Sequence, residues 1–225
     1  KQYTKNKSLA RKLAFYNAFN IGAQLKNVGI DANFSPVLDI KYSYGNKIIG
    51  DRSFGDDPKM VSVLGKEYCK GFRASGIFPV LKHFPGHGRA KEDSHLTLPY
   101  VNANIKELKA TDLIPFNDLH EEIFIMLAHI VYKNIDQNVA TYSPKIIQDL
   151  LRKRIGFEGL IITDDLSMQA LTGNVKEKTL NSYNAGCDIV LYCDAELDEM
   201  NEIYKFSRKI SDEKLDYLYY QKKIM

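Results

Sequence analysis

Short apolar runs alternate along the chain with longer segments in which apolar residues recur at helical spacing. The runs are bounded by glycine, proline or polar residues, which predicts buried strands. We expect strands at residues 30–38, 77–82, 123–128, 160–163 and 188–192. We expect helices at residues 8–28, 58–74, 104–120, from 143 onward, at 175–185, 195–210 and 211–221. Strands that alternate with helices indicate βαβ units and a parallel sheet.

Several local signals refine these elements. Ser8 is the expected N-cap of the first helix, and Ser143–Pro144 places an N-cap before a proline at the first helical position. Pro115 is expected to kink or split the helix at 104–120. The expected buried face of the first helix is Leu9, Leu13, Tyr16, Phe19 or Asn20, Ala23 and Val28. The expected alternating positions of the first strand are Ile30, Ala32, Phe34 and Val37.

Polar residues follow the predicted strands at the points where they end. These residues are Asp39, Lys82, His83, His129, Asp164, Cys193 and Asp194. A (β/α)8 barrel and an open doubly wound sheet both place their chemistry at the carboxyl ends of the strands. Five strands are fewer than the eight of a complete barrel, and both architectures fit the pattern. No Gly-x-Gly-x-x-Gly turn and no P-loop occurs, so nucleotide binding has little support.

The segment from Lys82 to His95 gathers the most reactive side chains of the chain. It reads K-H-F-P-G-H-G-R-A-K-E-D-S-H and holds three of the five histidines. Its Pro-Gly-His-Gly core cannot continue a strand or a helix. We therefore expect the strand to end at Lys82–His83 and to release a polar loop, which is the usual layout of an active site.

Composition narrows the class of protein. The chain has 225 residues, of which 44% are hydrophobic and 26% charged, which suits one globular domain. The net charge of +3 and the lack of a basic run disfavour nucleic-acid binding. No apolar stretch approaches the roughly 18 residues of a membrane span. Three cysteines favour reduced thiols in the cytoplasm over a disulfide framework. Since the first residue is Lys1, we expect the numbering to begin inside a longer protein.

Two carboxylates are candidates for catalysis. Asp164 directly follows an apolar strand, so it is either part of a site or the N-cap of the next segment, a role that Asp165 fits as well. Asp93 lies two residues before His95, where it can fix the imidazole tautomer for proton transfer. An Asx-turn with an incidental histidine explains that spacing equally well.

Further candidates concern binding. The group His83, His87, His95 and Asp93 could ligate a metal, although Pro85 and the glycines rule out the helix that usually presents such ligands. Lys82 and His83 could hold anions or hydroxyls, or Lys82 could be a solvated charge at a strand end. Arg52 lies in a loop and is either a substrate clamp or part of an ordinary ion pair.

Taken together, these motifs resemble the β-N-acetylglucosaminidases of glycoside hydrolase family 3. The resemblance runs from about residue 9 to 195 in unchanged order. It is carried by K-H-F-P-G-H-G at 82–88, D-S-H at 93–95 and I-T-D-D-L-S-M at 162–168. Supporting segments are F-S-P-V-L-D at 34–39, G-D-R-S-F at 50–54 and A-G-C-D at 185–188.

The resemblance implies a (β/α)8 TIM-type barrel and a single partial catalytic domain over residues 1–225. It implies a retaining, exo-acting enzyme that removes terminal N-acetylglucosamine from peptidoglycan fragments such as GlcNAc-anhydro-muropeptides, in the cytoplasm and without a metal or cofactor. The implied nucleophile is Asp164, and the implied acid/base is His95 with Asp93 as its partner. The implied substrate-binding residues are Arg52, Lys82, His83, Asp39 and His129.

The chain departs from that family at its beginning. Family members start with two further strands and an Asp-Gln-Glu-Gly-Gly-type segment, and nothing in residues 1–30 matches them. We therefore expect an incomplete barrel that lacks one or two N-terminal strands. Three alternatives stay open: a phosphorylase, in which phosphate attacks the intermediate; a non-catalytic carbohydrate-binding fragment; and a metal-dependent hydrolase built on the histidine cluster.

Overall fold

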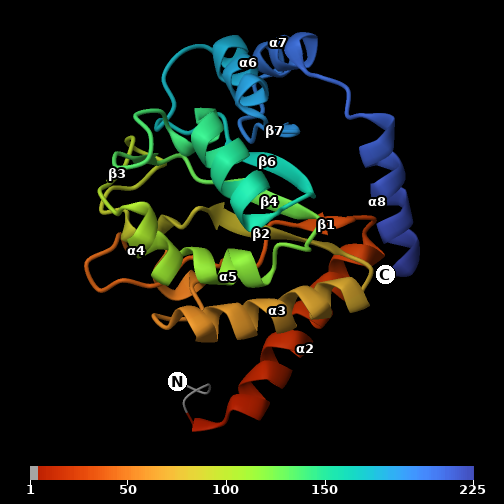
Figure 1. The fold of residues 1–225 in the computed structure, drawn as a ribbon. Coiled ribbons are helices and arrows are strands. Elements are labelled where there is room, and N and C mark those ends of the chain that lie inside the picture. The colour runs from red at the N-terminus through yellow and green to blue at the C-terminus, as the bar shows by residue number, and fades with distance from the viewer. Residues whose placement is uncertain (1–4) are drawn as a thin grey trace.

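A computed structural model describes residues 5–225, which form an α/β fold around a curled parallel sheet (Figure 1). The sheet has the order β1-β2-β4-β6-β7, and each neighbouring pair is parallel. Its strands are β1 (Ala32–Asn33), β2 (Phe78–Phe84), β4 (Phe124–Leu127), β6 (Leu160–Asp165) and β7 (Ile189–Leu191). A second parallel pair, not expected from the sequence, joins β3 (Tyr100–Val101) to β5 (Val131–Tyr132). The predicted parallel α/β sheet is confirmed, as a partial barrel.

Helices follow the strands as predicted. They are α2 (Lys7–Asn27), α3 (Pro58–Ala74), α4 (Ile105–Ala110), α5 (Leu113–Asp118), the π-helix η4 (Lys145–Ile155), α6 (Val175–Ala185), α7 (Leu197–Phe206) and α8 (Asp212–Ile224). Short 3₁₀ turns are η1 (Gly50–Arg52), η2 (His87–Arg89) and η3 (Ala140–Tyr142). The Ser143 hydroxyl accepts the Ile146 N–H, which confirms the predicted cap of η4.

Both faces of the sheet are buried, and alternate residues of each strand serve different cores. Leu81, Ile125 and Ile161 belong to the larger core, which the surrounding helices cover. Their neighbours in sequence face the other side and form a smaller core. That smaller core consists of Phe78, Val80, Ile123, Phe124, Met126, Leu160 and Ile162. Every second residue of a strand lies on the same face of the sheet. Lys82 on β2 and Asp164 on β6 therefore lie on the same concave face as the smaller core, nearer the carboxyl ends of the strands.

Helix α8 closes the concave side at the amino ends of the strands. Leu218 and Met225 are partly buried against the smaller core. The Lys222 ammonium lies 2.8 Å from Asp31, just before β1, and Lys214 pairs with Asp188, just before β7. Figure 1 shows α8 beside β1, away from the helices that flank the rest of the sheet. The helix therefore connects the two edge strands of the partial barrel.

The expected buried face of the first helix is wrong. Leu9, Leu13 and Tyr16 are exposed, and the helix instead packs its small residues, Ala10, Ala14, Ala18 and Gly22, toward α3. The approach is close, because a Cβ added at Gly22 would lie 1.9 Å from Ser75 Oγ. The N-cap is Asn6, whose side chain accepts the Leu9 N–H, and not Ser8. The buried face carries small residues because they allow α2 and α3 to approach closely, which large side chains would prevent.

Of two further elements, one confirms the expectation, since Pro115 was expected to kink or split its helix, and the other differs from it. The helix at 104–120 is split into α4 and α5 at Thr111–Asp112, four residues before Pro115. Proline has no N–H for the carbonyl four residues earlier and clashes with it, so the break falls there. The strand at 30–38 is reduced to two residues, and Ile30 and Phe34 are exposed because β1 is an edge strand.

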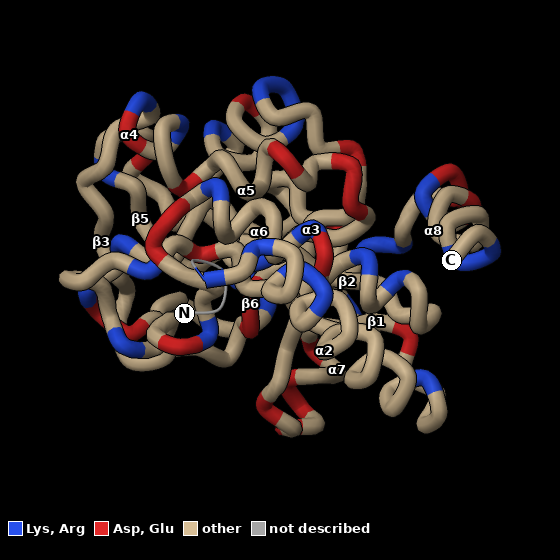
Figure 2. Tube along the Cα trace, turned by 90° about the horizontal axis from the view of Figure 1, so that it is seen from below, with Lys and Arg blue, Asp and Glu red and all other residues tan. Residues whose placement is uncertain are grey.

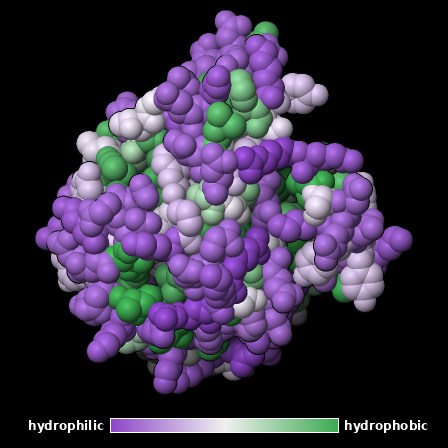
Figure 3. All heavy atoms as spheres, turned by 45° about the horizontal axis from the view of Figure 1, so that its top comes forward, coloured by the Kyte–Doolittle hydropathy of each residue, from purple (hydrophilic) through white to green (hydrophobic). Residues whose placement is uncertain are grey.

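Charge and apolar surface are both dispersed. Figure 2 shows Lys and Arg positions interspersed with Asp and Glu positions along the chain. Figure 3 shows one face of the molecule, which is mostly hydrophilic and interrupted by small apolar patches. Within residues 5–225, no helix combines the length and apolar character needed to cross a bilayer. Local polarity at the site therefore comes from its own lining residues and not from a one-signed face.

Candidate active site

A cavity of about 340 Å³ opens at the carboxyl ends of the strands, on the concave face of the sheet. It continues the alternation of the smaller core, with Lys82, Met126, Asp164 and Leu191 on strands β2, β4, β6 and β7. The full lining is Phe34, Ile48, Ile49, Arg52, Lys82, His83, His87, Ser94, His95, Met126, Asp164, Asp165, Met168, Leu191 and Cys193. Five of the eight residues expected at the site are in this lining, namely Arg52, Lys82, His83, His95 and Asp164.

Asp164 stands at the end of β6 with its side chain only 17% exposed. One carboxylate oxygen accepts the Asp165 N–H at 2.9 Å, and the other lies 3.9 Å from His83 Nε2. Burial opposes ionisation, but the electrostatic effects of the nearby His83 and His129 rings and the Asp165 N–H outweigh it and lower the pKa of Asp164. The group is therefore a largely buried anion, which is the ionisation state that a carboxylate nucleophile needs.

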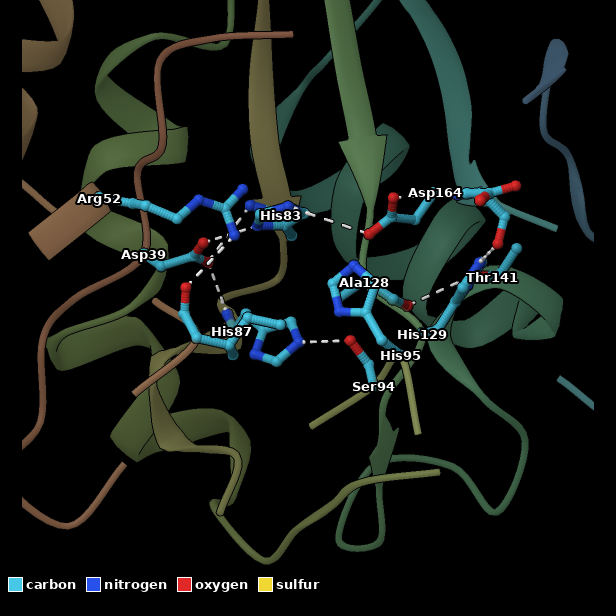
Figure 4. A network of polar contacts seen from close by, with 12 residues as sticks. Asp39, Arg52, His83, His87, Ser94, His95, Ala128, His129, Thr141 and Asp164 are labelled. Atoms are coloured by element: carbon cyan, nitrogen blue, oxygen red, sulfur yellow. Dashed lines mark hydrogen bonds and ion pairs between the residues drawn. The ribbon is translucent and has the colours of Figure 1, made fainter. Parts of the chain in front are cut away.

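Asp39 orients His83 from behind the cavity wall. Its Oδ2 lies 2.7 Å from His83 Nδ1, and its Oδ1 accepts the backbone N–H groups of His83 and His87. Despite full burial, the charge and hydrogen bond of His83 lower the pKa of Asp39. An ionised carboxylate only accepts, so Nδ1 carries the proton and Nε2 is directed toward Asp164. Figure 4 shows His83 between the two carboxylates.

The expected contact of Asp39 with substrate is corrected by this geometry. Asp39 is 0% exposed and is absent from the cavity lining, because both its oxygens bind the 83–87 segment. Its carboxylate therefore fixes the His83 ring and the backbone of His83 and His87.

His129, also expected to bind substrate, is likewise fully buried and outside the lining. Its Nδ1 lies 2.7 Å from Thr141 Oγ1, and its Nε2 lies 3.1 Å from the Asp165 carbonyl oxygen. A carbonyl can only accept, so Nε2–H is the donor. Burial lowers the pKa of His129, which favours the neutral ring. Its place behind β6 supports the strand end that carries Asp164.

Two cations line the side of the cavity formed by β2 and η1. Arg52 is the last residue of η1, and Lys82 lies two residues before the end of β2. Burial, followed by the charge of Arg52, lowers the pKa of Lys82. Both Lys82 and His83 reach the cavity, and the peptide bond between them is cis. Donors on one side of a pocket that has a carboxylate on the other suit a ligand rich in hydroxyl groups.

The Asp93–His95 pair lies on the exposed loop that follows η2. Asp93 Oδ1 accepts the His95 backbone N–H at 2.9 Å and lies 2.9 Å from the ring Nδ1. Burial opposes ionisation, but the backbone N–H and the ring of His95 lower the pKa of Asp93. The His95 side chain is 56% exposed and lines the same cavity as Asp164. Its Nε2 is therefore the atom left to exchange a proton with a ligand.

Sequence reasoning missed the contact that holds this loop. His87 Nε2 lies 2.9 Å from Ser94 Oγ, and both residues are buried (Figure 4). It also missed the apolar lining from Phe34, Met126, Met168 and Leu191. Strand parity could have indicated Met126, because it shares a face with Phe124 on β4.

The histidine cluster does not gather as metal ligands would. Among the residues that the structure describes, no three His, Cys, Asp or Glu side chains lie together so that they could hold a metal ion. His87 is engaged with Ser94, and His95 with Asp93. The side-chain positions therefore favour the separate Asp–His pairs over a metal centre.

Comparison with known proteins identifies relatives over most of the chain. Curated β-hexosaminidases match it, among them one from Xylella fastidiosa (strain M23), 38% identical over 87% of this chain and 59% of its own length. Another, from Methylobacillus flagellatus, is 39% identical over 82% of this chain and 54% of its own length. The chain thus spans less than two thirds of the length of these relatives.

Solved structures share the fold. NagZ from Neisseria gonorrhoeae, in complex with N-trifluoroacetyl-D-glucosamine, has a TM-score of 0.88 at 35% identity and covers 98% of this chain and 65% of its own. A glycoside hydrolase family 3 β-N-acetylglucosaminidase from Paenibacillus sp. str. FPU-7 has a TM-score of 0.84 at 33% identity, covering 95% of this chain and 43% of its own. The family "Glycosyl hydrolase family 3 N terminal domain" matches residues 4–217. The chain therefore belongs to the N-terminal domains of glycosyl hydrolase family 3.

Proposed function

We propose that the polypeptide carrying this chain is a retaining, exo-acting β-N-acetylglucosaminidase that removes terminal N-acetylglucosamine from peptidoglycan fragments. The observation that carries the proposal is that Asp164 and His95, whose ring is paired with Asp93, line one cavity. A retaining glycosidase needs a nucleophile and a proton donor on either side of the scissile bond. The relatives support the substrate class, since one of them binds a glucosamine derivative.

Asp164 is the proposed nucleophile. Its carboxylate attacks the anomeric carbon as the bond to the leaving oxygen breaks, and a covalent glycosyl-enzyme forms. His83 and the Asp165 N–H stabilise the carboxylate before attack and after release. In the second step, water attacks the same carbon and frees Asp164.

His95 is the proposed acid/base. Its Nε2–H donates a proton to the leaving oxygen in the first step, and the neutral ring takes a proton from the attacking water in the second. Asp93 fixes Nδ1 as the protonated inner nitrogen. A histidine donor avoids the repulsion that a second carboxylate would exert on Asp164. Its exposed loop allows the ring to approach once the sugar is bound.

Arg52, Lys82 and His83 are the proposed contacts to the sugar hydroxyls. They line the same cavity as His95, and Arg52 and Lys82 offer charged N–H donors. Met126, Met168 and Leu191 supply apolar surface against which a sugar ring can pack. We expect action in the cytoplasm, consistent with the free thiols of Cys69, Cys187 and Cys193.

The experiment is release of a chromogenic aglycone from an aryl N-acetyl-β-glucosaminide by the full native polypeptide. Asp164→Asn and His95→Ala should each reduce kcat/KM by roughly 10²-fold or more. The matched controls are Asp56→Asn and His120→Ala, two positions outside the cavity lining, which should retain turnover. Near-normal turnover in both site variants contradicts the proposal, and sugar binding without any turnover by the wild type favours the carbohydrate-binding alternative.

Phosphorolysis is the second candidate, because Arg52 and Lys82 give the cavity two cations and the proposed acid/base is not an anion. Phosphate could then attack the intermediate in place of water. Product analysis in phosphate buffer separates the two reactions: free N-acetylglucosamine indicates hydrolysis, and the sugar 1-phosphate indicates phosphorolysis.

A further inference from the structure

The loop that carries the Asp93–His95 pair is exposed along almost its whole length. Of residues 91–97, Ser94 alone is buried, with 1% of its surface exposed, although it lies between the two proposed catalytic residues. Its hydroxyl contacts His87 Nε2 at 2.9 Å. The other polar contacts of this segment to distant residues go to its backbone, from Asn46 Nδ2 to the Lys91 carbonyl and from the Gln169 N–H to the His95 carbonyl at 3.4 Å.

The backbone and ring of His87, by contrast, are held in place by contacts with buried residues. Its backbone N–H donates to the buried Asp39 at 2.6 Å, and its ring lies edge-on to that of His83 with centroids 5.7 Å apart. The two residues next to His87, Gly86 and Gly88, are also closely packed. Tyr132 donates to the Gly86 carbonyl at 2.7 Å, and a Cβ at Gly88 would lie 1.7 Å from the Ile40 carbonyl oxygen.

We propose that the hydrogen bond between His87 and Ser94 positions the Asp93–His95 pair for proton transfer, so that both are positioning residues of the reaction. The inference rests on the proposed function. Contacts run without a gap from Asp39 through His87 to Ser94, the residue before His95. The same buried carboxylate thus orients His83 beside the nucleophile and anchors the loop of the acid/base.

The ring is suited to this role because it stays neutral. Burial, reinforced by the nearby charge of His83, lowers the pKa of His87 to about 4. The hydrogen bond to Ser94 therefore keeps its character at pH values well above 4. Its Nδ1 has no partner among the described residues, which leaves the Nε2 contact as the polar anchor of the ring.

Ser94→Ala tests the proposal with a series of aryl N-acetylglucosaminides whose leaving groups differ in acidity. An acidic phenol departs with little help, whereas a poor leaving group depends on proton donation. We expect kcat/KM to fall by about tenfold or more for the poor leaving group and little for the acidic one, in the same sense as His95→Ala. Equal losses for both substrates, or a wild-type dependence on leaving group, would overturn the positioning role.

Ser62→Ala is the matched control, because Ser62 is also a buried serine whose hydroxyl donates to a side chain, Asp118, but lies outside the cavity. It should leave the dependence on leaving group unchanged. Amide hydrogen exchange of residues 91–97 gives a second readout that needs no activity. Exchange should accelerate in Ser94→Ala. Unchanged exchange would overturn the proposed tether, which is the hydrogen bond between His87 and Ser94, whether or not the enzyme is active.

The outcomes separate this inference from the proposed function. A wild type that cleaves none of the glycosides refutes the proposed function, and the hydrogen-exchange measurement then tests the tether by itself. An active wild type with a leaving-group effect in His95→Ala but none in Ser94→Ala refutes the tether alone.

Discussion

Asp93 holds His95 at two points with a single oxygen: Oδ1 accepts the backbone N–H and lies within hydrogen-bond distance of the ring Nδ1, each at 2.9 Å. The two explanations that the sequence left open, an Asx-turn and a catalytic pair, are therefore compatible in one geometry. The turn brings the imidazole back over its own carboxylate, and the lowered pKa of Asp93 keeps that carboxylate ionised.

Substitutions at Asp93 should separate the contribution of its turn-forming hydrogen bond from the contribution of its negative charge. Asp93→Asn keeps an oxygen for the backbone N–H but removes the negative charge beside the ring. We expect kcat/KM on a poor leaving group to fall by about tenfold or more, with an unchanged unfolding temperature. Asp93→Ala removes both contacts and should lose more activity. Equal activity of wild type and Asp93→Asn, measured under the same conditions, would show that the charge has no role.

Asp39 should matter for stability as well as for activity. It is a fully buried carboxylate whose partners are the His83 ring and two backbone N–H groups. Asp39→Ala leaves these donors without an acceptor, and we expect the free energy of unfolding to fall by roughly 3 kcal/mol or more. Denaturant titration measures this loss. Asp51→Ala, which removes an exposed partner of Lys41, is the control and should have no measurable effect.

The unfolding free energy should depend on pH through His87. Its pKa is lowered from 6.5 to about 4 in the folded state, so between these values the unfolded chain binds a proton that the folded chain does not. Stability from this group is complete above pH 6.5 and is lost as the pH falls toward 4, by roughly 3 kcal/mol in total. Denaturant titrations across this range should show a shallower slope in His87→Asn. A residual slope of the same sign is expected from His129, whose pKa burial also lowers. An unchanged slope in the variant would contradict the assignment.

How far the sequence predicts this molecule depends on the kind of signal. Apolar runs located all five strands of the main sheet, and they are most continuous in the central strands β2, β4 and β6, which are buried on both faces. The polar residues at the ends of the predicted strands indicated where the candidate site lies, because parallel strands bring their carboxyl ends to one edge of the sheet. The face of α2 was wrong, since periodicity finds large side chains whereas Ala10, Ala14 and Ala18 make the contact.

The roles of individual site residues were harder to predict for a related reason. Asp39 and Asp164 both follow an apolar segment, and no local pattern says which of them faces the cavity. The answer depends on the 83–87 segment, which folds back over Asp39 and covers it. The tether between His87 and Ser94 joins residues seven positions apart through a turn whose shape the sequence does not specify.

Helix α8 should stabilise the partial barrel chiefly through its apolar side chains. Leu218 packs against the smaller core, whereas Lys222 forms a largely exposed ion pair with Asp31. Leu218→Ala should lower the free energy of unfolding by about 1–2 kcal/mol, less than for a fully buried leucine. Lys222→Ala should cost under about 1 kcal/mol, because exposed ion pairs contribute little. Tyr219→Ala, at an exposed position of the same helix, serves as the control. A larger loss from Lys222→Ala than from Leu218→Ala would mean that the connection between the edge strands, and not the covered core, is what α8 contributes.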